Sequence, residues 1–217
     1  RKYGNLIGLN QDFKILDPDE AKVVLHRSLR VEPYYCRKYI STIGTAKDLG
    51  ISLDMLQEYL DEQIKKFIGI DIEKRLESLQ FEFQILYLQK DKEKKKKLVS
   101  EITVLQEIIG IKKFISTWRA YEKIKIKSKY QDYADLNNNA LILLSKFPEI
   151  TGDFSYIIVD EFQDTNKIQL DFLFAIARQG NITIVGDLNQ SIYQFRGAFK
   201  ENYSLFKKHF NISEKEV

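Results

Sequence analysis

The spacing of apolar residues divides the chain into a helical part and a mixed part. Between about residues 18 and 130, apolar residues recur every three or four positions, which is the spacing of one face of an α-helix. Asp17 and Pro18 open this region as a typical N-cap and first-turn residue. Positions that follow the helical spacing include Leu53, Leu56, Leu60, Ile64, Leu76, Leu79, Ile102, Leu105 and Ile108. The sequence therefore predicts several helices in residues 1–130.

The pattern changes after about residue 131. A helix is predicted over residues 132–147, ending at Pro148. The runs YIIV (156–159) and NITIV (181–185) are short and apolar on both faces, as in strands of a buried parallel sheet. An apolar helix lies between them, and such a strand–helix–strand order predicts a βαβ unit with parallel strands. A last amphipathic helix is predicted at 200–210, and the whole pattern predicts an α/β fold.

Polar residues follow both predicted strands directly. Asp160 and Glu161 come after the first strand, and GDLNQ (186–190) comes after the second. The carboxyl ends of parallel strands lie at one edge of the sheet, where ligands bind in such folds. Adjacent acids there are typical of a metal-ion site in which one acid holds the ion and the other activates water. An Asp-Glu pair can also be only a loop and helix start, but two polar motifs at one edge favour a site.

Composition excludes several classes of protein. The chain has 217 residues, of which 44% are hydrophobic, enough for packed cores. Cys36 is the only cysteine, so a disulfide within the chain is impossible, and with His26 and His209 it offers too few ligands for a zinc site. No apolar run approaches the roughly 18 residues that span a bilayer, and no signal peptide opens the chain. We therefore expect a cytoplasmic protein without a membrane partner.

Charge is distributed unevenly. Residues 1–131 carry 26 Lys/Arg against 19 Asp/Glu, a net +7, whereas residues 132–217 carry 8 against 12, a net −4, which together give the total of +3. A basic part suggests a polyanionic partner, although lysine-rich helices can also be merely well solvated. The stretch KDKEKKKK (90–97) has the same two interpretations, a solvated helix end or a DNA contact. Lys47 and the lysines at 94–97 are the candidate DNA contacts.

Several stretches resemble superfamily 1 DNA helicases of the UvrD/Rep type. YIIVDEFQDTN (156–166) resembles the Walker B motif of that family, and IVGDLNQSIYQFRGA (184–198) is similar to its next motif. DYADL (132–136) and GLNQDFKILDPDEAK (8–22) resemble two upstream segments. The resemblance implies a partial RecA-like P-loop NTPase parallel sheet with a mainly α-helical inserted subdomain. Residues 1–130 would be the inserted subdomain, and residues 131–217 the C-terminal part of the first RecA-like domain.

The resemblance also implies roles for individual residues. Asp160 would hold Mg²⁺, and Glu161, near the ion through water, would act as general base on the water that attacks ATP. Gln190 would contact the γ-phosphate. Residues implied to join the nucleotide site to its neighbours are Gln163, Asp164, Asp187 and Arg196, and those implied to bind single-stranded DNA are Tyr193, Phe195 and Arg196. Aromatic rings at such positions can stack on bases, although aromatic pairs also occur in ordinary cores.

The chain departs from the family in several respects. None of its ten glycines is followed by Lys, so the Gly-Lys-Ser/Thr loop that cradles phosphates is absent, and the chain begins with Arg1. Phe195 stands where Trp is usual, and Ala134 where an acid is common. We expect a portion of an ATP-dependent helicase or translocase that moves 3′ to 5′ on single-stranded DNA and at junctions with duplex, and that is inactive alone. The alternatives are a non-catalytic DNA-binding module and the helicase component of a helicase–nuclease.

Overall fold

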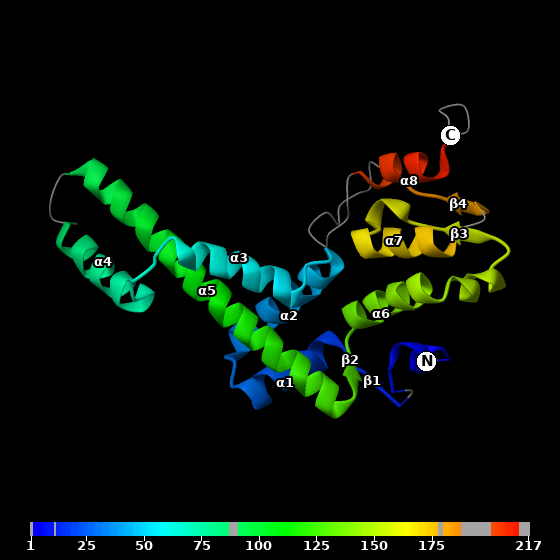
Figure 1. Cartoon of the computed structure of the whole chain (residues 1–217), viewed down its shortest axis with the longest axis horizontal. Helices are drawn as coiled ribbons and strands as arrows, with labels where there is room; N and C mark the ends of the chain where they lie inside the picture. The colour runs from blue at the N-terminus through cyan, green and yellow to red at the C-terminus, as the bar shows by residue number, and fades with distance from the viewer. Residues whose placement is uncertain (1, 11, 87–90, 178–179, 188–200, 213–217) are drawn as a thin grey trace. The chain divides into compact units, whose positions relative to one another are not determined.

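The computed structural model describes residues 2–10, 12–86, 91–177, 180–187 and 201–212, and in this part the chain is mostly helical with two small parallel sheets (Figure 1). Contacts between residues group the chain into two compact units. The first unit comprises Arg1–Ile51 together with Lys123–Val217, and the second unit comprises Ser52–Glu122. No helix of the described ranges is both long and apolar enough to cross a membrane.

The second unit consists of three helices that pack around two apolar clusters. Its helices are α3 (Leu53–Lys65), α4 (Ile72–Leu86) and most of α5 (Lys92–Ser128), which continues into the first unit. Leu60 of α3 packs with Ile108 and Ile115 of α5. Leu79 of α4 packs with α5 near its start, at Leu98 and Leu105. The apolar spacing predicted these helices because each buries the stripe that the spacing defines.

The first unit contains the remaining elements, among them a short sheet that the sequence did not predict. Strand β1 (Lys14–Ile15) pairs in parallel with β2 (Tyr130–Gln131), more than a hundred residues away. Two residues per strand are too few for a period-two pattern. The other elements are η1 (Gly4–Ile7), α1 (Pro18–Leu29), α2 (Pro33–Asp48), α6 (Tyr133–Lys146), η2 (Pro148–Asp153), β3 (Ile157–Val159), η3 (Phe162–Asp164), α7 (Lys167–Ile176), β4 (Ile182–Ile184) and α8 (Asn202–Phe210).

The contact boundary differs from the predicted boundary at residue 130. The first 51 residues group with residues 123–217, because β1 pairs with β2 and because α2 packs against α6. Local charge and periodicity carry no information about such distant pairings, which explains the difference. The assignment of 1–130 and 131–217 to two helicase subdomains stays a prediction.

The second sheet has the predicted βαβ topology. β3 and β4 pair in parallel with Ile157 opposite Ile182, and α7 connects them. Helices α7 and α8 cover one face of this sheet, where Phe162, Leu170 and Phe206 form the core. The prediction that the strands are buried on both faces is wrong for the described residues, since these helices cover a single face. The side chains that point to the other face are exposed, including Tyr156 (60% exposed), Ile158 (71%), Thr183 and Val185 (53%).

Candidate functional site

Asp160 and Glu161 lie at the same edge of the β3–β4 sheet as Gly186 and Asp187, the described part of the second polar stretch, as predicted. The backbone N–H of Val185 donates to the Val159 carbonyl at 2.8 Å, which continues the pairing beyond both strands. The N–H of Phe162 then donates to the Val185 carbonyl at 3.0 Å. The chain segments after β3 and β4 are therefore held side by side where the two motifs begin.

The two adjacent acids at this edge are accessible to solvent. Asp160 is exposed, and its Oδ1 accepts the N–H of Glu161 at 2.9 Å. Glu161 is also exposed, and its backbone is left-handed, with φ 51° and ψ 40°. Mg²⁺ prefers oxygen ligands and keeps several of its waters, so an exposed carboxylate is a suitable partner for it. The residues present therefore fit a magnesium ion held through Asp160.

Gln163 connects the two polar stretches. Its side chain is buried (5% exposed), its Nε2 donates to Glu161 Oε2 at 2.6 Å, and its Oε1 accepts the N–H of Asp187 at 3.0 Å. The structure thus brings together Glu161, Gln163 and Asp187, three of the residues that the sequence singled out. Asp164 lies in η3 beside them, and its Oδ1 is buried without a hydrogen-bond partner in the described part of the chain.

Helix α8 supports this edge through residues that the sequence did not single out. Asn202 is buried, and its Nδ2 donates to the Thr165 carbonyl at 2.5 Å. The Tyr203 ring contacts the Phe162 ring edge-on, with centroids 4.9 Å apart. Burial raises the pKa of the Tyr203 hydroxyl, and the Asp187 carboxylate raises it further. Only the amphipathic pattern of residues 200–210 pointed to this helix.

Gly186 is a further site residue that sequence reasoning missed. A Cβ at this position would lie 2.3 Å from Gln163 Oε1 and 2.6 Å from the Tyr203 hydroxyl oxygen. Both distances are far below van der Waals contact, so a side chain here would have to displace the Gln163 carboxamide and the Tyr203 hydroxyl. The available signal was a glycine directly after a strand, which often marks a close approach of two chain segments.

Four of the predicted site residues lie outside the described residues. Gln190 is the proposed γ-phosphate contact. Tyr193 and Phe195 are proposed DNA contacts, and Arg196 is proposed both to bind DNA and to join it to the nucleotide site.

Lys47 does not lie on an exposed surface, and the structure corrects the prediction that it contacts DNA. The residue is 9% exposed, and its Nζ lies 2.6 Å from Asp135 Oδ1 and 3.2 Å from Asp132 Oδ2. An ammonium group held by two carboxylates inside the protein is not available to a phosphate. The carboxylates come from DYADL, whose partner lysine lies 85 residues upstream of Asp132, so no local pattern revealed the pairing.

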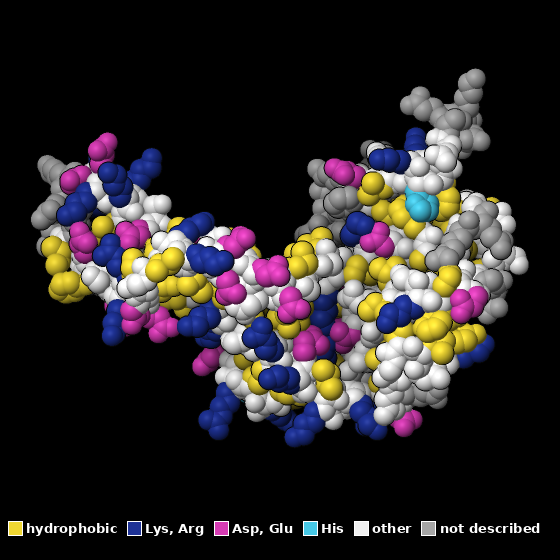
Figure 2. All heavy atoms as spheres, in the orientation of Figure 1, with side chains coloured by type: hydrophobic (Ala, Val, Ile, Leu, Met, Phe, Trp, Pro, Cys, Tyr) yellow, Lys and Arg dark blue, Asp and Glu magenta, His cyan; other side chains and the backbone are white. Residues whose placement is uncertain are grey.

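The lysine-rich stretch occupies the start of α5 in the second unit. Within Ser52–Glu122 the sequence has 13 Lys/Arg and 13 Asp/Glu, so this unit is electrically neutral. Over the face in view, Figure 2 shows basic and acidic side chains interspersed along this unit. Lys94 Nζ lies 3.3 Å from Glu82 Oε1, an exposed ion pair. The excess of positive charge in residues 1–131 therefore belongs to the parts in the first unit.

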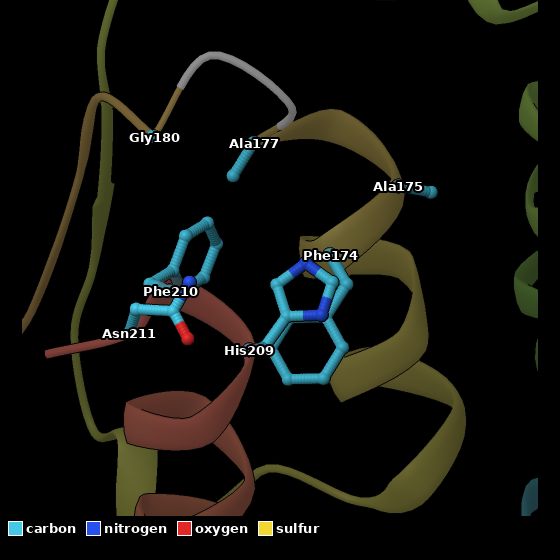
Figure 3. A pocket seen from close by; sticks show the side chains of 7 residues that line it. All are labelled: Phe174, Ala175, Ala177, Gly180, His209, Phe210 and Asn211. Carbon is cyan, nitrogen blue, oxygen red and sulfur yellow. The ribbon is translucent and has the colours of Figure 1, made fainter.

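A pocket of about 600 Å³ lies at the other end of the α7–α8 layer (Figure 3). The His209 ring stacks on the Phe174 ring there, with centroids 3.9 Å apart and planes 3° apart. Because α7 starts after the carboxyl end of β3 and ends before β4 begins, this pocket lies away from Asp160. It therefore takes no part in the site. Its lining residues are Phe174, Ala175, Ala177, Gly180, His209, Phe210 and Asn211.

The relatives found by comparison with known proteins all carry helicase names. "DNA helicase II" of Haemophilus influenzae is 28% identical over 214 residues, which are 94% of this chain and 23% of the relative. "ATP-dependent DNA helicase SRS2" of Saccharomyces cerevisiae is 28% identical over 213 residues, 93% of this chain and 16% of the relative. An "ATP-dependent helicase/nuclease" of Levilactobacillus brevis is 37% identical over 105 residues, 42% of this chain and 8% of the relative.

The chain spans less than a quarter of the length of each of these relatives. The sequence profile of the UvrD/REP helicase N-terminal domain matches residues 1–211, nearly the whole chain. The resemblance seen in the two motifs therefore extends across both compact units. This chain belongs to the UvrD/REP helicase N-terminal domain family.

Proposed function

We propose that the chain is part of a longer ATP-dependent DNA helicase or translocase, which couples Mg²⁺-ATP hydrolysis to 3′–5′ movement on single-stranded DNA. The observation that carries the proposal is the meeting of the Asp160–Glu161 pair and the Gly186–Asp187 pair at one sheet edge, bridged by Gln163. In this proposal residues 131–217 form the C-terminal part of a RecA-like ATPase domain, and residues 1–130 its inserted helical subdomain. The names of the relatives support the same activity.

Two acids carry the proposed chemistry. Asp160 would hold Mg²⁺, which neutralises charge on the β- and γ-phosphates of ATP when it is bound. Glu161 would accept a proton from the attacking water as the water oxygen bonds to the γ-phosphorus and ADP leaves. Gln190 would contact the γ-phosphate. The loop that cradles phosphates, which this sequence does not contain, would come from elsewhere in the complete protein.

The proposed link to DNA runs through the segment after Asp187. Tyr193 and Phe195 would stack on bases, with about 1–3 kcal/mol for each stacked base. Arg196 would contact phosphate or join this segment to the carboxylates. Single-stranded DNA and its junctions with duplex are the proposed partners.

A second candidate is the helicase component of a helicase–nuclease. The relative named as a helicase/nuclease favours it. The two candidates share the ATP site and differ in nuclease activity, so digestion of a labelled duplex by the complete protein with ATP and Mg²⁺ separates them.

The test compares two substitutions in the complete protein. Glu161→Gln keeps the size of the side chain but cannot accept the proton, so ATP turnover should fall about 10²–10⁴-fold while Mg²⁺-ATP binding persists. Asp160→Asn should in addition weaken Mg²⁺-ATP binding, because a neutral amide is a poorer partner for the ion. Steady-state ATPase assays and a nucleotide-binding titration measure the two effects.

Asp171→Asn is the matched control. Asp171 is an acid of α7 that pairs with Lys167 of the same helix, and its substitution should leave turnover unchanged. Wild-type turnover in Glu161→Gln would exclude Glu161 as the base. No ATP turnover in the unchanged complete protein would instead favour a DNA-binding module that does not use ATP.

A further inference from the structure

The carboxamide of Gln163 has one orientation that satisfies both of its neighbours. Its Nε2 faces Glu161 Oε2 at 2.6 Å, and its Oε1 faces the N–H of Asp187 at 3.0 Å. A carboxylate only accepts hydrogen bonds and a backbone N–H only donates, so turning the amide over would break both contacts. The side chain is also buried and therefore fixed in this orientation.

Space for the carboxamide comes from Gly186. A Cβ there would lie 2.3 Å from Gln163 Oε1 and 3.1 Å from the backbone nitrogen of Phe162. Gly186 is not among the glycines with positive φ, which in the described ranges are Gly8, Gly50, Gly69 and Gly180. The glycine is therefore needed for space rather than for its backbone conformation.

The backbone around Glu161 is also held in place. Left-handed φ and ψ values are uncommon for a residue with a side chain, and Glu161 is one of four such residues in the described chain. Its carbonyl accepts the N–H of Asp164 at 2.9 Å, and the next residue, Phe162, is bonded to Val185. With the backbone fixed, the bond from Gln163 decides the direction of the Glu161 carboxylate.

We propose that Gln163 is a positioning residue for hydrolysis, which aligns the Glu161 carboxylate and makes that alignment depend on the backbone at Gly186–Asp187. This inference rests on the proposed function. The hydrogen bond from Nε2 uses one of the two lone pairs of Glu161 Oε2, so Oε1 is the less engaged oxygen and the better acceptor for the proton of the attacking water. Any displacement of the chain after β4 moves the Asp187 N–H, and through Gln163 it moves the base.

The first test is Gln163→Met in the complete protein, which keeps the length of the side chain and removes both hydrogen bonds. We expect kcat for ATP to fall about 10–100-fold, since misplacing a catalytic group by about 1 Å can cost about 10²-fold. The KM for Mg²⁺-ATP should change less than about twofold, because Gln163 contacts the base rather than the nucleotide. Gly186→Ala should produce the same pattern by pushing the carboxamide away from Asp187.

Gln163→Glu tests the pH dependence of kcat, which should not change if Gln163 has only a structural role. It replaces the donor with a second carboxylate beside Glu161, and two such groups at this distance favour sharing a proton. The acid limb of the kcat–pH profile should therefore shift to higher pH, with activity partly restored in alkaline buffer. An unshifted limb would contradict the proposal.

Gln169→Met is the control, because the side chain of Gln169 only closes the first turn of α7 by accepting the Asn166 N–H at 3.0 Å. It should lower thermal stability without lowering kcat. In a Glu161→Gln background, Gln163→Met should cause no further loss, since the base is already gone. Full kcat in Gln163→Met, or an equal loss in both backgrounds, would overturn the inference. Wild-type turnover in Glu161→Gln alone would instead refute the role of Glu161 as the base in the proposed function.

Discussion

Four charged side chains of the first unit form a largely buried cluster, which we call the ion-pair cluster: Lys47, Lys125, Asp132 and Asp135. Lys125 is 1% exposed, and its Nζ lies 2.7 Å from Asp132 Oδ2 and 2.5 Å from Asp135 Oδ2. Burial by itself raises the pKa of Asp132, but Lys47 and Lys125 outweigh it, and the pKa falls to about 2. The cluster ties the end of α5 and helix α2 to the start of α6.

The lowered pKa of Asp132 gives stability a defined pH dependence. An unfolded Asp has a pKa of about 3.9, so the folded state gains stability above that pH and loses it as the pH falls from about 4 to about 2. The difference corresponds to about 3 kcal/mol in the free energy of unfolding. Above about pH 5 this contribution is constant.

Lys125→Met should lower the free energy of unfolding by about 3 kcal/mol at pH 7, because it leaves two largely buried carboxylates with too little positive charge. It should also bring the pKa of Asp132 back toward its ordinary value. The deficit relative to the unchanged chain should therefore shrink as the pH falls from 5 to 3. Urea unfolding of residues 1–217 at several pH values measures both effects.

Lys123→Met is the control for this substitution, since Lys123 is an exposed lysine on the same helix. Its effect should stay within about 0.5 kcal/mol. A Lys125→Met deficit that does not change with pH would show that Lys125 stabilises by packing its stem and not by its charge.

The acids of the ion-pair cluster also show how far single residues could be predicted. The sequence marked DYADL through its resemblance to a helicase segment, but gave it no role. In the structure, Asp132 and Asp135 close a capping box at the start of α6 and hold two buried lysines. Lys47 looked like any surface lysine, because burial depends on partners that are distant in sequence.

Helix starts were the most predictable features at the level of elements. Asp17 caps α1, as the Asp-Pro signal predicted, and the structure adds a capping box with Glu20. The helix after the first acidic motif has a similar box, in which Asn166 Oδ1 accepts the Gln169 N–H at 2.9 Å. A capping box involves only the N-cap residue and the residue three positions later, so it can be recognised from the local sequence alone.

Strand burial was less predictable, because it depends on what covers the sheet. Ile157 and Ile158 look alike in sequence, yet the first faces the α7–α8 layer and the second is exposed. The apolar run correctly predicted a parallel strand. The number of covered faces is a property of the whole fold and is not encoded in the strand.

Asn166→Ala should destabilise the first unit by about 1 kcal/mol, because the first turn of α7 loses its cap. Asn166 is also buried (8% exposed), directly after the motif that contains Glu161. Urea unfolding of residues 1–217 measures the loss, and Asn5→Ala, an exposed asparagine of η1, is the control. A loss no greater than that of the control would mean that packing alone starts α7.

At the scale of the whole molecule, the net charge lies in the first unit and not in the second. That unit is neutral, so the +7 of residues 1–131 lies on residues 1–51 and 123–131, which have 13 Lys/Arg against 6 Asp/Glu. The −4 of residues 132–217 lies in the same first unit. The prediction of a basic helical part was thus right in sum, but the charge is carried outside the three-helix unit.

This charge distribution predicts weak, salt-dependent binding of residues 1–217 to DNA without base-sequence preference. With about three phosphates neutralised on single-stranded DNA, affinity should fall about 20-fold between 50 and 200 mM salt, because bound counterions are released. Replacing the exposed Lys123, Lys127 and Lys129 by Gln should weaken binding and flatten the salt dependence. Fluorescence anisotropy with oligonucleotides of several sequences measures affinity and salt slope together.

Lys94, Lys96 and Lys97 provide the matched control, since replacing them by Gln also removes three exposed lysines, but from the neutral second unit. If net charge around the first unit attracts the polyanion, this variant should lose less affinity than the Lys123, Lys127 and Lys129 variant. A larger loss would show instead that the lysine-rich start of α5 contacts DNA directly. Affinity that ignored salt would contradict an electrostatic origin altogether, because every phosphate contact must release counterions.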